Sequence, residues 1–120
     1  MSTPAVSDFY CDQALSGLTP VTVVAETETV LAFEHTRPSH PVHIVVVPKA
    51  HVPSLADLGE EGPVLLTDVM MVVGEVAAKV SAQYGACAVI TNLGRYQESQ
   101  HFHVHVTYRG DDDRPHPEGC

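Results

Sequence analysis

The sequence predicts an α+β fold in which a β-sheet is covered by one long helix. Three strand-like runs come first, one long helical run follows, and two more strand-like runs complete the pattern. Strands grouped in this way, with a segregated helix, are typical of α+β domains and not of doubly wound sheets. The 120 residues, 44% of them hydrophobic and 18% charged, fit one domain over 1–120. Residues 1–7 are expected to form a loose arm, and residues 110–120 an acidic tail.

Three strand-like runs precede the helix, at Val21–Glu26, Thr29–Glu34 and His43–Val47. The first two are rich in β-formers and flank a short polar turn, which predicts a hairpin. The third is continuously apolar after its first residue, so we expect a strand buried on both faces. Two prolines exclude a helix between residues 36 and 41. One or two helical turns are expected over Asp8–Ser16.

The long helix is expected over Val64–Tyr84, with Pro63 in its first turn and Gly85 as its stop. Its polar residues fall on one narrow stripe, which comprises Asp68, Glu75, Lys79 and Gln83. The opposite stripe is apolar and comprises Leu66, Met70, Val73, Ala77, Val80 and Tyr84. This pattern predicts that the helix packs its apolar stripe on one face of the sheet.

The charge and the cysteines restrict the classes of function. Six basic residues stand against 15 acidic ones, a formal net charge of −9 with no basic cluster. A DNA- or RNA-binding role is therefore not expected. The widely spaced Cys11, Cys87 and Cys120 indicate free thiols in a reducing compartment. No apolar run approaches the ~18 residues of a membrane span and no signal-like segment opens the chain, so we expect a cytoplasmic protein without a membrane partner.

The last two strands are expected at Ala86–Thr91 and His101–Tyr108, joined by a polar loop over Asn92–Gln100. Alternation along the last strand sends successive side chains to opposite faces. One face then carries three imidazoles, from His101, His103 and His105. The other face carries Phe102, Val104 and Val106 and is expected to pack on the core.

Three interpretations of this imidazole face are open: structural histidines, a metal site, or phosphate chemistry. Cα atoms two residues apart on a strand lie roughly 6.5 Å apart, and the outer two of three roughly 13 Å apart. Convergence of all three on one zinc ion is therefore awkward, although two of them with another ligand could bind a metal. Neutral imidazole is also a nucleophile, a hydrogen-bond donor and a proton carrier near pH 7. An extended anionic substrate suits the spacing better.

The segment around the triad and three others resemble the histidine-triad (HIT) superfamily, and within it the Hint-like hydrolase branch. These segments are VLAF (30–33), HPVHIVVVPKAH (40–51), VITN followed by YQESQ, and HFHVHV (101–106). The resemblance extends from about Val21 to Tyr108. It implies a five-stranded antiparallel sheet with one long and one short helix, often in a homodimer joined through the long helices and a sheet edge. It also implies a cleft that binds a purine nucleotide or nucleotide conjugate, with no cofactor or metal, and an activity of nucleotide hydrolase or phosphoramidase.

The resemblance also implies roles for particular residues. His103 would attack the α-phosphorus and form a nucleotidyl-histidine, while a backbone carbonyl near His101 holds its other ring nitrogen protonated. His105 would contact phosphate oxygens and His101 would orient the triad. His43 matches a fourth active-site histidine, Asn92 a residue near the phosphate and ribose, and Gln97 a residue that touches the phosphate or leaving group.

Several positions depart from the family pattern. His35 stands where many relatives carry an Asp or Asn that binds the ribose hydroxyls, and Glu98 stands where the Hint branch has a serine. Arg95 lies in the same shortened loop and is either a phosphate clamp or a solvated surface residue. An N-terminal zinc site is not expected, because only Cys11, with Asp8 at the partner spacing, is left of it. A non-catalytic nucleotide-binding module and a metal-binding protein remain as alternatives to the enzyme.

Overall fold

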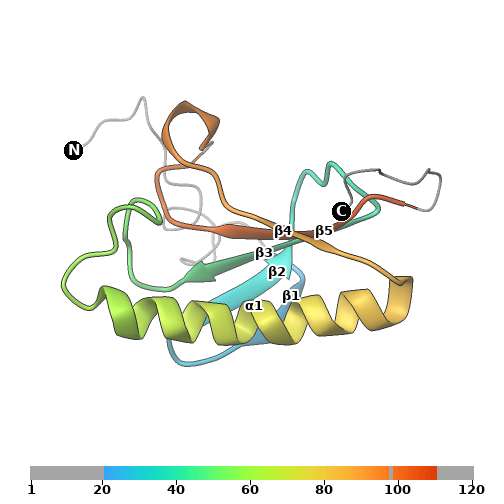
Figure 1. Cartoon of the computed structure of the whole chain (residues 1–120), viewed down its shortest axis with the longest axis horizontal. Helices are drawn as coiled ribbons and strands as arrows, with labels where there is room; N and C mark the ends of the chain where they lie inside the picture. Colours follow the sequence, from blue (N-terminus) through green and yellow to red (C-terminus); the bar gives the residue numbers. More distant parts are fainter. Residues whose placement is uncertain (1–20, 98, 111–120) are drawn as a thin grey trace.

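A computed structural model describes residues 21–97 and 99–110. A five-stranded antiparallel sheet has the strand order β1-β2-β3-β5-β4, and helix α1 lies across one face (Figure 1). The elements are β1 Val23–Glu26, β2 Val30–Glu34, β3 Val42–Pro48, α1 Gly62–Tyr84, β4 Ala88–Ile90, the 3-10 turn η2 Gly94–Tyr96 and β5 Val104–Tyr108. The predicted α+β class and the five-stranded sheet are confirmed. The expected arm, the helical turn over Asp8–Ser16 and most of the tail lie outside the described residues.

The turn between β1 and β2 is closed by Thr27. Its backbone N–H donates to the Val30 carbonyl at 2.8 Å. Its hydroxyl accepts the N–H groups of Thr29 and Val30 at 3.2 and 3.0 Å. The predicted hairpin is therefore present, with β1 antiparallel to β2.

The core lies on both faces of the sheet. The face toward α1 carries the larger cluster, in which residues of β2, β3, β5 and the segment before β5 pack on the helix: Val30, Ala32, Ile44, Val46, Phe102, Val104 and Val106 among them. The opposite face carries a smaller cluster of Leu31, Phe33, Val45 and Val47. β3 contributes to both clusters, which confirms that its apolar run is buried on both faces.

Helix α1 covers the sheet with a stripe that differs from the predicted one. The buried positions are Leu65, Val69, Val72, Val73, Val76 and Val80. Met70 and Tyr84 of the predicted stripe are 44% and 40% exposed, so that part of the prediction is wrong. The cause is that α1 is apolar on most of its circumference, and its pattern does not distinguish the sheet-facing side. The helix ends at Gly85, whose φ of 96° is left-handed and favours glycine.

The last strand begins later than the sequence predicts. β5 starts at Val104 because its ladder with β3 ends at the pair Val46 and Val104. Before that point the Phe102 N–H donates to the Val52 carbonyl at 2.7 Å. His101 and His103 therefore lie on the segment that leads into the strand, and only His105 of the triad lies in the ladder.

No helix in residues 21–97 and 99–110 combines the length and the apolar character that crossing a bilayer needs.

A truncation in the larger core cluster tests the packing of β3 on α1. Val46 is fully buried, so Val46→Ala leaves a cavity and is expected to lower the free energy of unfolding by about 2 kcal/mol. Val23 is half exposed on the edge strand, and Val23→Ala is expected to change it by less than about 0.5 kcal/mol. Urea unfolding of both variants measures the difference, and equal effects would contradict the assigned core.

Candidate active site

His101 connects the approach to β5 with the end of β3. Its ring is fully buried and Nε2–H donates to the Pro48 carbonyl at 2.8 Å. The ring of His51 meets it edge-on, with centroids 5.1 Å apart. The next residue, Phe102, is buried in the larger core cluster. Packing on one side and a hydrogen bond on the other therefore hold this segment of backbone in place.

His103 is held by the backbone of the same segment. Its Nδ1–H donates to the His101 carbonyl at 2.7 Å, and its side chain is 3% exposed. A carbonyl can only accept, so Nδ1 carries the hydrogen and Nε2 of the neutral ring is unprotonated. The Thr91 hydroxyl donates to the carbonyl of His103 at 2.7 Å. The contact that the resemblance implied for this ring is present.

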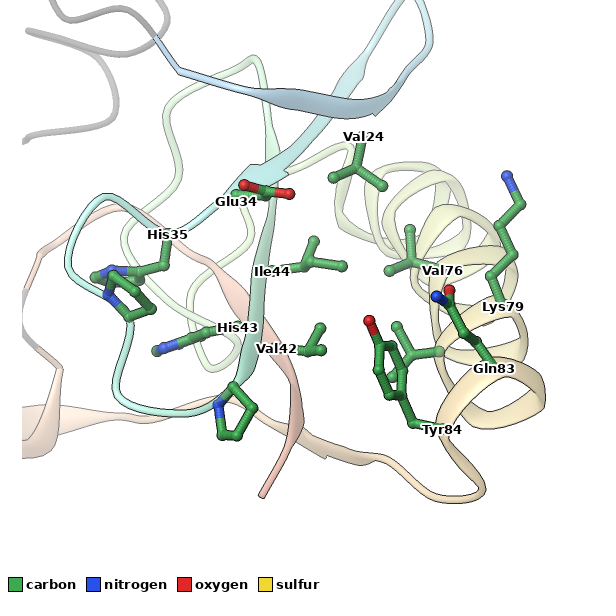
Figure 2. Close-up of a pocket in the computed structure, with 13 residues that line it drawn as sticks. Val24, Glu34, His35, Val42, His43, Ile44, Val76, Lys79, Gln83 and Tyr84 are labelled. Atoms are coloured by element: carbon green, nitrogen blue, oxygen red, sulfur yellow. The ribbon is translucent and has the colours of Figure 1, made fainter. Parts of the chain in front are cut away.

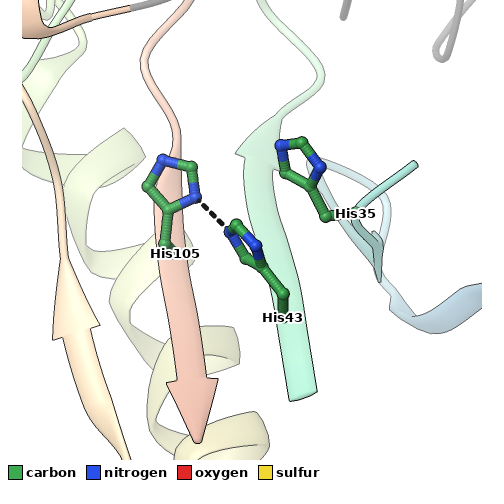
Figure 3. Close-up of side chains that lie close together, drawn as sticks. All are labelled: His35, His43 and His105. Carbon is green, nitrogen blue, oxygen red and sulfur yellow. Dashed lines mark hydrogen bonds between the residues drawn. The ribbon is translucent and has the colours of Figure 1, made fainter. Parts of the chain in front are cut away.

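His43 and His105 form a hydrogen-bonded pair across β3 and β5 (Figure 3). The Ser39 N–H donates to Nδ1 of His43 at 3.1 Å, so the hydrogen of the neutral His43 ring lies on Nε2. Nε2–H then donates to Nδ1 of His105 at 2.9 Å. This bond in turn places the hydrogen of the neutral His105 ring on Nε2. A backbone amide thus determines the tautomer of two rings in succession.

His35 is placed in the same way from the loop that follows β2. Its Nδ1 accepts the Arg37 N–H at 2.9 Å, which leaves Nε2 of the neutral ring as a donor. The ring stacks on His43, with centroids 4.3 Å apart and planes 23° apart. His103 and His105 meet edge to face at 4.8 Å. Four imidazoles from three segments therefore form one continuous group.

A cavity of about 340 Å³ opens beside this group. Its lining comprises His35, Arg37, Ser39, His40, His43, Ile90, Asn92, Tyr96, His105 and Thr107. Asn92, predicted to lie near the substrate, is among them. His103 is in ring contact with one lining residue, His105. The cavity thus brings together side chains from β3, β5, the end of β4 and the loop over residues 36–41.

Two predicted substrate-binding residues do not line this cavity. Gln97 is buried and its amide donates to the Pro53 carbonyl at 2.6 Å. Arg95 is exposed on η2. The side chain of Glu98 lies outside the described residues. The loop residues Arg37 and His40 were not predicted, although their position between two site histidines, His35 and His43, could have indicated them.

A second hollow, of about 380 Å³, lies on the helix side of the sheet (Figure 2). It shares His35 and His43 with the first cavity. The remaining wall is largely apolar, from residues such as Val24, Ile44 and Val76. His105 lines only the first of these two cavities, which is therefore the candidate active-site cavity.

The paired histidines are uncharged near neutral pH. Burial, followed by repulsion from the neighbouring rings of His35, His40 and His103, lowers the pKa of His43 from 6.5 to about 4. Burial, with repulsion from His103, His43, His35 and His40, likewise lowers the pKa of His105 to about 3. Both rings therefore act as neutral hydrogen-bonding groups. An anion bound beside them would favour the charged form and raise these values.

Three of these rings also form a candidate metal site. One nitrogen of each of His35, His43 and His105 lies within 4.8 Å of the others. A metal ligand must present an unprotonated nitrogen. In each of these rings the unprotonated Nδ1 already accepts a hydrogen bond. A cation would have to displace these bonds, so the arrangement fits an anionic ligand better than a metal ion.

The fold and the histidine cluster define a histidine-triad protein, and comparison with known proteins agrees. The HIT domain model matches residues 17–111, and the chain belongs to this family. Protein HitA of Neisseria gonorrhoeae is 33% identical over 88 residues, which cover 72% of this chain and 82% of HitA.

Solved structures show the same similarity. A histidine triad protein from Clostridium difficile is 30% identical with a TM-score of 0.74, covering 97% of this chain and 99% of that one. A HIT family hydrolase from Legionella pneumophila Philadelphia 1 is 26% identical with a TM-score of 0.75, covering 94% of this chain and all of the other.

The depressed histidine pKa values predict a stability that depends on pH. Between pH 6.5 and 4 the unfolded chain binds protons at His43 and His105 that the folded chain does not bind. The free energy of unfolding should therefore fall as the pH is lowered from 7 through this range. Urea unfolding at pH 7.0, 6.0 and 5.0 measures the slope.

The matched variant is His105→Gln, which keeps a polar side chain but removes one titrating ring. Its slope between pH 7.0 and 5.0 should be smaller than that of the unmodified chain. An unchanged slope would contradict the assignment of the acid sensitivity to this pair.

Proposed function

We propose that the chain is a nucleotide hydrolase or transferase, of the phosphoramidase kind, that acts at the α-phosphate through His103. The observation that carries this proposal is the hydrogen bond from Nδ1–H of His103 to the His101 carbonyl. It leaves Nε2 with the lone pair that a nucleophile needs. The similarity to a HIT family hydrolase supports the same reaction class.

The reaction then takes two steps. Nε2 of His103 attacks the α-phosphorus, a nitrogen–phosphorus bond forms, and the bond to the leaving group breaks. The leaving group departs with that electron pair and takes up one proton. Water, or another acceptor in a transfer, attacks the phosphorus and breaks the nitrogen–phosphorus bond. The products of hydrolysis are the nucleoside monophosphate, the protonated leaving group and the regenerated ring.

The surrounding residues bind and orient the phosphate in this proposal. Nε2–H of His105 is a donor for phosphate oxygens, and charge in the transition state strengthens such bonds. His43 holds His105 in the required tautomer through their mutual bond. Asn92 lines the cavity and offers an amide to the phosphate or ribose.

Cys87 is a free thiol, which fits action in the reducing cytoplasm.

Replacement of the proposed nucleophile tests the mechanism. His103→Ala removes Nε2, the only atom of the enzyme that bonds to phosphorus in this mechanism. Turnover of an adenosine 5′-phosphoramidate should therefore fall by at least about 10³-fold. Quenching of the unmodified enzyme with an alkaline denaturant, in which a histidine nitrogen–phosphorus bond survives, should trap an adenylyl group on the peptide that contains residue 103. Mass spectrometry of the products measures turnover, and peptide mapping locates the adduct.

The control for that experiment is Glu75→Gln on the exposed side of α1, which should keep most of the turnover. Thermal unfolding confirms that both variants fold. Undiminished turnover in His103→Ala would exclude the mechanism. Tight nucleotide binding without turnover in the unmodified chain would favour the non-catalytic binding module, and stoichiometric zinc would favour the metal-binding alternative.

We propose further that two chains form a homodimer through α1 and the edge strand β4. β4 ends the sheet, so its outer edge is unpaired within the described chain. Beside it an apolar hollow of about 300 Å³ is lined by Leu55, Leu66, Met70, Val89, Thr91, Phe102 and Val104. An open edge next to an apolar patch is typical of an association surface.

A charge placed in this hollow should separate the chains. Met70→Glu is expected to convert a dimer into a monomer of 12.9 kDa, because a carboxylate would be buried without a partner at the interface. Met71→Glu is the control, since Met71 is 66% exposed and lines a different hollow. Light scattering after gel filtration measures both masses, and a dimeric Met70→Glu variant would contradict this interface.

A further inference from the structure

The wall of the site cavity formed by residues 35–43 is rich in donors. It contributes the side chains of His35, Arg37, Ser39, His40 and His43. Among the described residues that line the cavity there is no carboxylate, although the chain has a net charge of −9. We call His35, Arg37 and His40 the loop wall. These side chains are hydrogen-bond donors, as expected of a site that binds anions. They are more numerous than one phosphate beside His103 requires.

The loop wall is separate from the phosphate position at the triad. The ring centroids of His35 and His105 are 6.1 Å apart, with His43 stacked on the former and bonded to the latter. An anion at the loop wall and a phosphate at the triad would therefore contact different donors. The α-phosphate has the ribose on one side and the leaving group on the other, so the second anion belongs to one of these two groups.

The loop wall is also held in place before any ligand binds. The N–H groups of Arg37 and Ser39 donate to Nδ1 of His35 and of His43. Pro38 and Pro41 restrict the backbone on both sides of His40. A wall organised in this way binds at a smaller cost in conformational entropy.

The polarity of the loop wall distinguishes a hydroxyl from a phosphate. Ribose hydroxyls bind well to a carboxylate, which accepts hydrogen bonds from both. The neutral His35 ring instead has its acceptor nitrogen occupied by Arg37 and offers Nε2–H. The Arg37 guanidinium only donates, and its fork matches a phosphate. A phosphate ester, which accepts bonds through its oxygens, fits these groups better than vicinal hydroxyls do.

We propose that the loop wall binds a second phosphate carried on the ribose, so that the substrate is a 5′-phosphoryl conjugate of a nucleoside 2′- or 3′-phosphate. This inference rests on the proposed reaction of His103 at the α-phosphate. It makes His35 and Arg37 the residues that determine specificity.

Binding by the full chain tests the proposal without turnover. The ligands are AMP, ADP, adenosine 2′,5′-bisphosphate and adenosine 3′,5′-bisphosphate, measured by calorimetry. At least one ribose bisphosphate should bind about tenfold or more tightly than AMP, as expected for charge-assisted bonds to one added phosphate. ADP should not share this gain. Equal binding of ADP would show general attraction of negative charge and would overturn the proposal.

The variants assign the preference to residues. His35→Asp should remove or reverse the preference for the bisphosphate, and Arg37→Gln should reduce it. Lys49→Gln removes a positive charge after the far end of β3, where Lys49 pairs with Glu26 at 2.6 Å, and should leave the preference unchanged. A preference that survives both loop-wall substitutions would overturn the assignment. Thermal unfolding confirms the fold of each variant.

Turnover separates this inference from the proposed function. Adenosine 5′-phosphoramidates with and without a ribose phosphate are compared by kcat/KM, and the phosphorylated one should be the better substrate. Turnover of both with equal kcat/KM would refute the loop wall as a specificity site and leave the reaction standing. A binding preference without turnover of either would refute the reaction and leave the second anion site standing.

Discussion

The hydrogen bond from His101 to the Pro48 carbonyl fixes the backbone segment on which the geometry of the site depends. It joins the end of β3 to the backbone just before β5, at a level where the ladder between the two strands has already ended. With Phe102 packed in the larger core cluster, it holds the His101 carbonyl in position. That carbonyl then orients the His103 ring. The orientation of the His103 ring thus depends on a buried side chain two residues away.

Much of this architecture is predictable from the sequence because its signals are local. Alternation along residues 101–106 places imidazoles and apolar side chains on opposite faces, and the core cluster contains Phe102, Val104 and Val106 as expected. Pro63 and Gly85 mark the ends of the helix within one or two residues. The side of α1 that faces the sheet cannot be predicted from the local sequence. Valines, leucines and methionines surround the helix, and only contact with the sheet selects Val69 and Val76 over Met70.

The loop between β2 and β3 shows a second limit. Its residues carry no periodic pattern, and two prolines indicate only that it is neither helix nor strand. Its conformation follows from backbone amides that meet imidazole nitrogens, contacts that depend on where the flanking strands place His35 and His43. Gln97 shows the reverse case. Its position before the triad predicted a ligand contact, but its amide is bound to the Pro53 carbonyl.

The His101 carbonyl that orients His103 belongs to the main chain, and this has a consequence for heredity. A side-chain acceptor is lost whenever a point mutation replaces the residue that carries it. A peptide oxygen is encoded by no particular codon and persists whatever amino acid occupies the position. The side-chain donors of residues 35–43 have no such protection, because a mutation in one codon can remove each of them. Substitutions in the loop can therefore change the ligand, while the orientation of the central ring persists as long as His101 and Phe102 hold the peptide in place.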